Sequence, residues 1–477
     1  MGQKNRRQPQ LMENVEIVGA GSEGMAVAKP DQKVVFVPFA APGDVVDMQV
    51  IRKKKNYFEG KILQFHKLSD QRTTPECSHF GLCGGCKWQH LEYKFQLQYK
   101  QQQVKDNFDR IGKFDYPPIL PILQSELKYF YRNKLEFTFS GRKWLTDGAL
   151  SGTHQPEDLK GLGFHLPGMF DRILDIEKCY LQTDLSNHIR LAIKEFTIEK
   201  NYSYYDARKQ DGLLRNLLVR NTSDGQTMVI VIALYNDERL QNELLPFIAA
   251  SFPEITSLMY VINGKKNDQI TDLSIQLFAG KPYLTETMAS PIANEPLLQF
   301  RIGPVSFYQT NAVQAEILYK TAFDFANFKG NEFVYDLYTG TGTIANYIAR
   351  SVKKVLGIEY IEEAIADAVT NSKLNGIQNT EFLAGDMAVV LNDELIRQFG
   401  KPDVIITDPP RAGMHPKVIE NLIRIKAPRI IYISCNPATQ ARDIALLAPI
   451  YDVKAVQPVD MFPQTHHVEN VALLELK

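Results

Sequence analysis

Apolar and polar residues alternate in short runs near the start of the chain. The runs fall between about residues 11 and 68, at residues 15–18, 34–37, 45–50 and 61–64, with glycine-containing turns among them. Alternation with a period of two predicts strands that bury one face, and several short strands joined by such turns predict a small barrel. We therefore expect a β-barrel at the N-terminal end of this chain.

From about residue 305 the pattern changes to continuous apolar runs that alternate with helical spacing. Buried strands are predicted at residues 333–337, 354–358, 404–407 and 429–434, and a helix at 361–375. This alternation is typical of a doubly wound parallel sheet, as in a Rossmann-like fold. Between the two regions a helix is predicted at 91–110 and a mixed α/β segment at about 124–298, with strands at 131–139, 214–220 and 227–233.

A length of 477 residues suits about three domains, so we expect a multidomain protein. We place the domains at residues 1–69, 70–298 and 299–477. Hydrophobic residues make up 44% and charged residues 23%, which is typical of soluble globular proteins. No uncharged apolar run reaches about 18 residues, and the polar start leads into no apolar signal segment. We therefore expect a cytoplasmic protein with no membrane contact.

The net charge of −1 means that any binding of nucleic acid requires a local basic face. Residues 52–55 read Arg-Lys-Lys-Lys, and Tyr57 and Phe58 follow them within the predicted barrel. Cations beside aromatic rings suit single-stranded nucleic acid. The same residues suit a solvated turn equally well.

Five cysteines occur, and three of them lie within ten residues of one another. Cys77, Cys83 and Cys86 have C-x5-C-x2-C spacing, and Cys179 is a distant fourth thiol. Clustered thiols in a chain without a secretion signal favour a metal site over disulfides. Four thiolates complete either a zinc site or an iron–sulfur site, and the spacing alone does not choose between them.

A glycine-containing turn follows the predicted strand at 333–337 and holds Gly340 and Gly342. Glycines there let a ligand approach the backbone, and the helix that follows presents free N–H groups. The next strand ends at Glu359, which suits ribose hydroxyls, and Asp386 ends a third apolar run. The turn lacks the G-x-G-x-x-G pattern and follows Asp336, which favours S-adenosylmethionine over NAD. The alternative is a generic turn with solvated carboxylates.

The last of these strands ends at Ser434, and Cys435 stands immediately before Asn436 and Pro437. A thiol at the carboxyl end of a parallel strand lies where open α/β sheets bind their ligands. It can act as a nucleophile if it is accessible and deprotonated. The alternative is a buried cysteine that only packs.

Six ordered motifs together resemble one family, the RNA uracil-5-methyltransferases that carry a TRAM domain, and within it the type that acts on bacterial 23S ribosomal RNA. The resemblance covers nearly the whole chain. Its motifs are the four cysteines already described, Phe307-Tyr308-Gln309-Thr310-Asn311, Asp336-Leu337-Tyr338-Thr339-Gly340, Asp408-Pro409-Pro410-Arg411-Ala412-Gly413, Ser434-Cys435-Asn436-Pro437-Ala438-Thr439 and His467-Val468-Glu469-Asn470.

The resemblance implies an OB-like TRAM barrel, a central domain with a four-iron, four-sulfur cluster on the four cysteines, and a C-terminal methyltransferase domain. It also implies that residues 93–122 pack with the catalytic domain. The methyl donor would be S-adenosylmethionine. The residues that we expect to bind it are Gln309, Tyr338, Gly340, Thr343, Glu359, Asp386 and Asp408.

The same resemblance assigns chemical roles. Cys435 would add to C6 of a uracil so that C5 can accept a methyl group, and Glu469 would then remove the C5 proton. His466 and His467 are alternatives as the base. Asp408 would bind the uracil edge or lie beside the methyl donor, and its neighbour Arg411 could pair with phosphate or support Asp408.

The expected partner is RNA whose target uridine is flipped out of its stack, and no obligate protein partner is expected. The candidate phosphate contacts are Arg132, Lys134, Arg215 and Arg220. The leading hypothesis is methylation of 23S ribosomal RNA to 5-methyluridine. The alternatives are the same reaction on tRNA, and a noncatalytic iron–sulfur protein that binds RNA or senses redox state.

Overall fold

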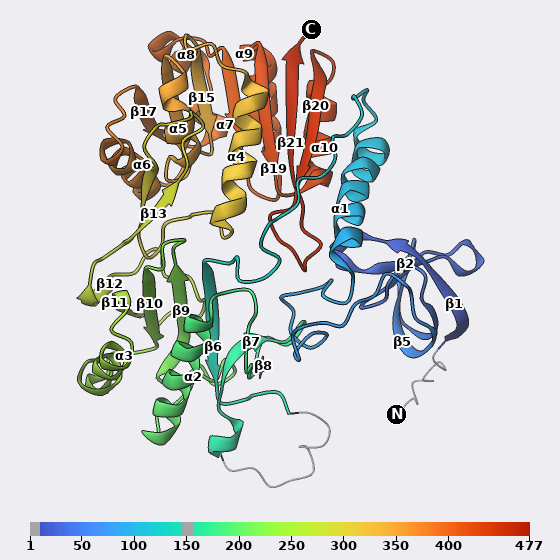
Figure 1. Cartoon of the computed structure of the whole chain (residues 1–477), viewed down its shortest axis with the longest axis vertical. Helices are drawn as coiled ribbons and strands as arrows, with labels where there is room; N and C mark the ends of the chain where they lie inside the picture. The colour runs from blue at the N-terminus through green and yellow to red at the C-terminus, as the bar shows by residue number, and fades with distance from the viewer. Residues whose placement is uncertain (1–9, 146–155) are drawn as a thin grey trace, which may run out of the picture.

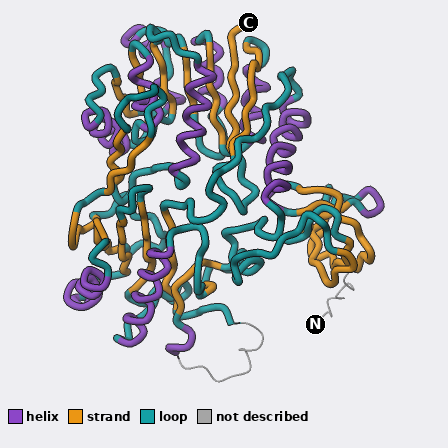
Figure 2. Tube along the Cα trace, in the orientation of Figure 1, coloured by secondary structure: helices purple, strands orange, loops and turns teal. Residues whose placement is uncertain are grey.

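The computed structural model describes residues 10–145 and 156–477. Figure 1 shows a small barrel in blue, a central sheet in green and a larger α/β sheet in yellow to red. The trace in Figure 2 shows helices on both sides of the upper sheet. Within the described residues, no helix is long and apolar enough to cross a membrane.

The predicted N-terminal barrel is confirmed. Alternate side chains such as Val15 and Ile17, or Val46 and Met48, fill its interior, as a period of two requires. The five strands close in the order β1-β2-β3-β5-β4. Their bounds are β1 (Leu11–Ala20), β2 (Ala26–Ala28), β3 (Val35–Val37), β4 (Val45–Lys53) and β5 (Phe58–Lys67).

The central region is built on a seven-stranded sheet in the order β12-β11-β10-β9-β6-β7-β8. Helix α2 (Asp184–Glu199) and helix α3 (Leu245–Ser251) contribute to the core on one of its faces. The strands are β6 (Lys134–Ser140), β7 (Gly161–His165), β8 (Ile173–Leu174), β9 (Leu214–Asn221), β10 (Thr227–Ala233), β11 (Ile255–Ile262) and β12 (Ile275–Gly280). A separate hairpin of β13 (Leu284–Met288) and β14 (Leu298–Ile302) leads to the C-terminal sheet.

The C-terminal sheet has seven strands in the order β17-β16-β15-β18-β19-β21-β20. The first five of these strands are parallel, as predicted, and β21 lies antiparallel between β19 and β20. The strands are β15 (Phe333–Leu337), β16 (Lys354–Glu359), β17 (Thr380–Ala384), β18 (Val404–Thr407), β19 (Arg429–Ser434), β20 (Tyr451–Val459) and β21 (Glu469–Leu476).

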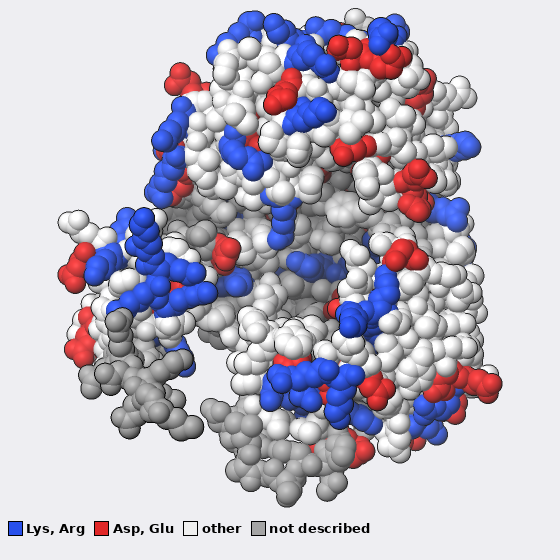
Figure 3. Space-filling view, turned by 180° about the vertical axis from the view of Figure 1, so that it is seen from behind, with Lys and Arg blue, Asp and Glu red and all other residues white. Residues whose placement is uncertain are grey.

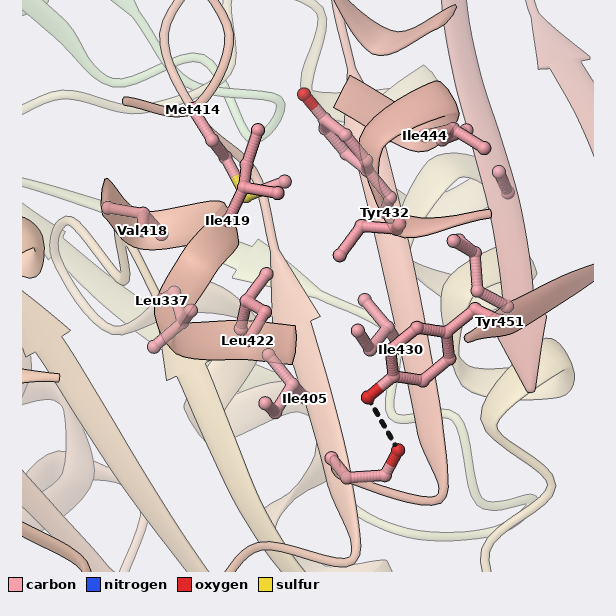
Figure 4. Close-up of a cluster of buried hydrophobic side chains, with 14 of the residues drawn as sticks. Leu337, Ile405, Met414, Val418, Ile419, Leu422, Ile430, Tyr432, Ile444 and Tyr451 are labelled. Carbon is pink, nitrogen blue, oxygen red and sulfur yellow. Dashed lines mark hydrogen bonds between the residues drawn. The ribbon is translucent and has the colours of Figure 1, made fainter. Parts of the chain in front are cut away.

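Helices cover both faces of this sheet because its strands are apolar on both faces. They are α4 (Ala312–Ala326), α5 (Thr343–Ile348), α6 (Glu362–Leu374), α7 (Met387–Val390), α8 (Asp393–Phe399), α9 (Pro416–Ile425) and α10 (Pro437–Leu447). Figure 4 shows one of the two cores, in which Ile405 and Tyr432 from the strands pack with Leu422 and Ile444 from the helices.

Helix α1 (Tyr93–Asn107) lies beside the C-terminal sheet, although it directly follows the cysteine-rich segment in sequence (Figure 1). A π-helical turn at Phe108–Gly112 continues it, and both Val104 and Phe108 belong to the same buried core as Tyr432. The α-helix thus ends three residues before the predicted end at residue 110. The domain boundaries at residues 69 and 298 remain predictions.

Candidate active site

The predicted site residues lie along one edge of the C-terminal sheet. Because β21 runs antiparallel to β19 and ends at the C-terminus at the top of Figure 1, the parallel strands end toward the middle of the molecule. In sheet order from β17 to β21, the strand ends carry Asp386, Glu359, Tyr338, Asp408, Cys435 and Glu469.

The turn after β15 is shaped by positive φ angles at Tyr338, Gly340 and Gly342, of 63°, 55° and 74°. A positive φ at tyrosine is uncommon, and such outliers gather at binding sites. The carboxylate of Glu359 accepts a hydrogen bond from the Gly340 N–H at 3.2 Å and from the Tyr360 N–H at 2.8 Å. The end of β16 thereby holds the glycine turn in place.

The helix that follows this turn, α5, begins at Thr343, whose hydroxyl lies 3.3 Å from that of Thr341. Farther along the edge, Asp386 caps the N-terminus of α7 by accepting a hydrogen bond from the Ala388 N–H at 2.8 Å. Asp386 remains exposed, so its carboxylate is accessible to a ligand. The three strand ends from β15 to β17 thus form one continuous row.

Two carboxyl groups, those of the buried Asp336 and the partly buried Asp408, lie where this row meets the other half of the edge. Asp336 accepts a hydrogen bond from the Thr339 hydroxyl at 2.5 Å, while its second oxygen has no partner among the described residues. Burial raises the pKa of Asp336 to about 7. Burial and the neighbouring Asp336 also raise the pKa of Asp408 to about 7. Both groups therefore change their protonation state close to neutral pH.

Cys435 occupies a tightly bonded turn between β19 and α10. The Asn436 N–H donates to the Ser434 hydroxyl at 3.1 Å, and the Asn436 side chain caps α10 through the Ala438 N–H. The Asn436 amide also donates to the carbonyl of Arg411 at 3.0 Å. These bonds fix the thiol on the strand end and join its turn to the loop that follows Asp408.

The sheet register brings Cys435 and Glu469 together. Ser434 on β19 pairs with Asn470 on β21, so one further step along this antiparallel pair sets Cys435 opposite Glu469. Burial, Glu469 and Asp408 raise the pKa of Cys435 to about 12, and Arg411 opposes this shift. Burial first, and then Asp408, also raise the pKa of the Glu469 carboxyl well above its usual range.

The segment before α4 crosses the same region. The Gln309 carbonyl accepts a hydrogen bond from the Asn133 amide at 2.9 Å, which ties it to the central sheet. Phe307 is 65% exposed, so its ring offers an accessible aromatic surface beside Gln309. The Thr341 hydroxyl donates to the Phe307 carbonyl at 3.3 Å, which joins the segment to the glycine turn.

The four clustered cysteines line a single cavity of about 500 Å³. The Gln89 side chain accepts a hydrogen bond from the Cys77 N–H at 3.1 Å, and the Asn187 side chain exchanges two hydrogen bonds with the backbone of Cys179. The Glu177 N–H donates to the ring of His79 at 2.9 Å, which joins the two cysteine segments. The protein alone therefore holds the distant thiol beside the other three.

Two of the four predicted phosphate contacts are wrong. Arg215 is 1% exposed and donates to the Asn263 carbonyl, and Arg220 is 3% exposed and donates to the carbonyls of Gly303 and Ser306. Both lie on β9, whose residues are buried on both faces of the central sheet except at its last position. Arg132 and Lys134 are only partly buried, line the cysteine cavity and stay as candidates.

Sequence reasoning missed a buried ion pair near this edge. The Lys100 ammonium donates to Asp460 at 2.6 Å, and both side chains are fully buried. A signal was present, because Lys100 is four residues from Gln96 and from Val104 and so shares their buried helix face.

The ends of β15, β16 and β17 thus offer acidic and glycine-containing positions for an adenosine ligand, and the strand ends that carry Cys435 and Glu469 lie beside them. The same chain also has a closed barrel near its N-terminal end. This combination is the one that the sequence motifs lead us to expect of a methyltransferase that uses S-adenosylmethionine and acts on RNA.

Comparisons with known proteins agree. The family model described as tRNA (Uracil-5-)-methyltransferase matches residues 274–477, and the TRAM domain model matches residues 12–63. An "uncharacterized RNA methyltransferase" of Bacteroides thetaiotaomicron is 54% identical, with 96% of this chain and 100% of that protein covered. Another, of Chlorobaculum tepidum, is 38% identical, with 96% of this chain and 93% of that protein covered.

A solved structure also resembles the whole chain. It is the Pyrococcus abyssi tRNA (uracil-54, C5)-methyltransferase in complex with S-adenosyl-L-homocysteine. The TM-score is 0.74 and the identity 26%, with 96% of this chain and 100% of that chain covered. The chain belongs to the TRAM-containing family of RNA (uracil-5-)-methyltransferases.

Proposed function

We propose that this enzyme transfers a methyl group from S-adenosylmethionine to C5 of a uridine in 23S ribosomal RNA, with Cys435 as nucleophile and Glu469 as base. The observation that supports this proposal is the register of β19 and β21, in which Ser434 pairs with Asn470, the chain neighbours of the thiol and the carboxyl. The ribosomal target rests on the resemblance in motifs. A tRNA target is the second candidate, because the P. abyssi enzyme of similar structure is named for tRNA.

The chemistry begins with the sulfur of Cys435. Its thiolate forms a bond to C6, and the electron pair of the C5–C6 double bond moves toward C5 and the O4 carbonyl. C5 then bonds to the methyl carbon, and the bond from that carbon to the donor sulfur breaks with its electrons going to the sulfur. The covalent link thus converts a weakly nucleophilic carbon into one that can be methylated.

Release of the product requires a base. The Glu469 carboxylate takes the proton from C5, the C5–C6 double bond forms again, and the Cys435 sulfur leaves as thiolate. Burial lowers the pKa of His466 to about 4 and that of His467 to about 3, so neither imidazole is a strong base. The raised pKa of Glu469 means that its carboxylate, once ionised, is a stronger base than either imidazole.

The reaction requires ionised forms of Cys435 and Glu469, whereas the surroundings of both groups favour the protonated forms. Cys435, Asp408 and Glu469 all have raised pKa values because they are buried near one another. The Arg411 guanidinium favours the thiolate. S-adenosylmethionine supplies a positive sulfonium group, and a cation bound beside Asp408 would favour the ionised forms of the same groups.

The proposed cofactor surface follows from the strand ends. Glu359 would accept hydrogen bonds from ribose hydroxyls, and Asp386 would accept from the adenine amino group. Tyr338, Gly340 and Thr343 would let the donor approach the turn and the start of α5. Gln309 would lie at the junction of cofactor and target base. RNA would reach the site through a flipped uridine, as chemistry on a base requires.

We also propose a four-iron, four-sulfur cluster on Cys77, Cys83, Cys86 and Cys179. All four thiols line one cavity of about 500 Å³, which has room for a group larger than one ion. Zinc would need its sulfurs about 2.3 Å from a single point. Among the described residues, no group of three or more His, Cys, Asp or Glu side chains is arranged to hold a single metal ion. The size of the cavity supports the cluster, and the resemblance in motifs is the basis on which we also propose a cytoplasmic location.

Incubation with labelled S-adenosylmethionine tests the function, with 23S RNA and bulk tRNA as separate substrates under anaerobic conditions. We expect label in 5-methyluridine of the ribosomal RNA. Label in tRNA alone would support the second candidate. The absence of label from both would support a noncatalytic iron–sulfur protein. A Cys435→Ala variant should bind RNA but transfer no methyl group, and a Glu469→Gln variant should accumulate a covalent RNA–protein adduct on a denaturing gel.

A further inference from the structure

The segment at residues 460–468 leads from β20 directly into Glu469. Most of the bonds that hold it come from outside its own sheet. The Tyr131 hydroxyl, from the central region, donates to the Pro463 carbonyl at 2.9 Å. The Asn311 amide at the start of α4 donates to the Met461 carbonyl at 3.0 Å. The position of the proposed base therefore depends on distant parts of the chain.

Gln464 is the most constrained residue of this segment. It has a φ of 68°, which is an uncommon conformation for a residue with a side chain. Its N–H donates to the Gln96 side chain at 2.9 Å, and its side-chain oxygen accepts from the Gln96 amide at 3.0 Å. Its carbonyl accepts from the N–H groups of both Lys87 and Trp88, each at 3.0 Å. Such a conformation persists only where its surroundings hold it.

Gln96 makes this arrangement possible from the first turn of α1. The side chain is fully buried. Besides its two bonds with Gln464, its amide donates to the carbonyls of Trp88 and Leu91 at 3.0 and 2.9 Å. The Gln96 side chain thus bonds both to the segment before Glu469 and to the end of the cysteine-rich loop. Lys87 and Trp88, which belong to that loop, directly follow Cys86 in the sequence.

One turn farther along α1, Lys100 holds the beginning of the same segment. Its ammonium donates to Asp460 at 2.6 Å and to the Phe462 carbonyl at 3.0 Å. The Tyr93 hydroxyl donates to the other oxygen of Asp460 at 2.8 Å. Helix α1 therefore fixes the segment at two points, near its beginning and near its middle.

We propose that Gln96 is a positioning residue for the methylation reaction, because it holds Gln464 and thereby sets Glu469 where it can take the C5 proton. This inference rests on the proposed role of Glu469. Loss of Gln96 leaves the Cys435 turn intact, since the bonds of that turn come from Ser434, Asn436 and Arg411. Adduct formation should therefore continue, and release of the methylated RNA should slow.

The test is a single-turnover reaction of the complete, cluster-containing enzyme with an RNA that it methylates. Adduct is measured on a denaturing gel, and methylated free RNA is measured in parallel. In a Gln96→Ala variant we expect adduct formation within about twofold of the wild-type rate and release slowed by about tenfold or more, as loss of buried hydrogen bonds would produce. Gln102→Ala, an exposed glutamine on the same helix, is the matched control and should behave as wild type.

Equal slowing of both steps, or slowing of neither, would overturn the proposal. A Gln464→Ala variant applies the same criterion with Gln96 left in place, because it removes the side-chain bond to Gln96 and disfavours the backbone φ of 68°. It decides the matter if Gln96→Ala does not fold. The Glu469→Gln variant separates the two levels of the account: if it accumulates no adduct, the assignment of the base fails, whatever Gln96 does.

Discussion

Binding of the methyl donor should depend on pH through Asp336 and Asp408, the two aspartates in the middle of the site. The pKa values of Asp336 and Asp408 are both raised to about 7, mainly by burial. At pH 6 a group with such a pKa is ionised in about one tenth of molecules, and at pH 8 in about nine tenths. A sulfonium cation near Asp408 is attracted to the carboxylate and not to the neutral acid. Affinity for S-adenosylmethionine should therefore increase with pH.

The magnitude follows from the ionised fraction. If binding returns one carboxyl to an ordinary pKa near 4, the dissociation constant should be about tenfold higher at pH 6 than at pH 8. Binding at pH 6 should also release close to one proton. Calorimetric titration in two buffers with different ionisation enthalpies measures both the affinity and the released protons.

S-adenosylhomocysteine is the control ligand because its sulfur is uncharged, and its dissociation constant should change much less over the same range. An Asp408→Asn variant should lose most of the pH dependence for S-adenosylmethionine. Identical pH profiles for the two ligands, or affinity for S-adenosylmethionine that falls as the pH rises, would refute the reasoning.

Three further predictions concern the parts of the chain that support the site. A Lys100→Met variant leaves the buried Asp460 carboxylate without its cation, so the free energy of unfolding should fall by about 3–5 kcal/mol in urea titrations; a fall below about 1 kcal/mol would count against the buried pair. An Arg220→Met variant should lower the melting temperature but leave the salt dependence of RNA binding unchanged, because its guanidinium does not reach solvent; a smaller slope would restore the phosphate contact. The wild-type protein purified without oxygen should contain about four iron and four sulfide per chain, and Cys179→Ser should lower both; stoichiometric zinc would contradict the cluster.

The barrel and the parallel sheet could be predicted because the buried residues of each follow a simple periodic pattern along the sequence. Alternate burial at Val15 and Ile17 is typical of a strand with one solvent-exposed face. The continuous run of buried residues that ends at Ser434 is typical of a strand covered on both faces. The full strand order of the central sheet could not be predicted, because it depends on the pairing of β9 with β6, two strands that lie far apart in sequence. The end of α1 at Asn107 could not be predicted exactly, because the π-helical turn that follows it keeps the helical spacing of apolar residues.

The incorrect prediction that Arg215 and Arg220 contact phosphate has a physical reason, and the sequence held a sign of it. Both arginines lie in an apolar run of the kind that is covered on both faces of a sheet. A cation in such a strand must find carbonyl or carboxylate partners inside the protein, as both do here. Their charge suggested phosphate, whereas their neighbours along the strand indicated burial.

The motifs identified the site residues one by one, but not their arrangement. Only the insertion of β21 between β19 and β20 sets Glu469 opposite Cys435, and no local pattern states that order. The link from Gln96 to Gln464 spans 368 positions of the chain, and both are ordinary polar residues in the sequence. Such long-range bonds between common side chains become visible only in the folded structure.

The covalent bond between Cys435 and uracil C6 is the central claim, and it can be measured directly. An RNA substrate with 5-fluorouridine at the target position has no C5 proton to remove, so the adduct should persist after methyl transfer. Mass spectrometry of the digested complex should then find one methylated fluorouridine on the peptide that contains Cys435. A bond to any other residue, or free RNA that has been methylated without an adduct, would contradict the account.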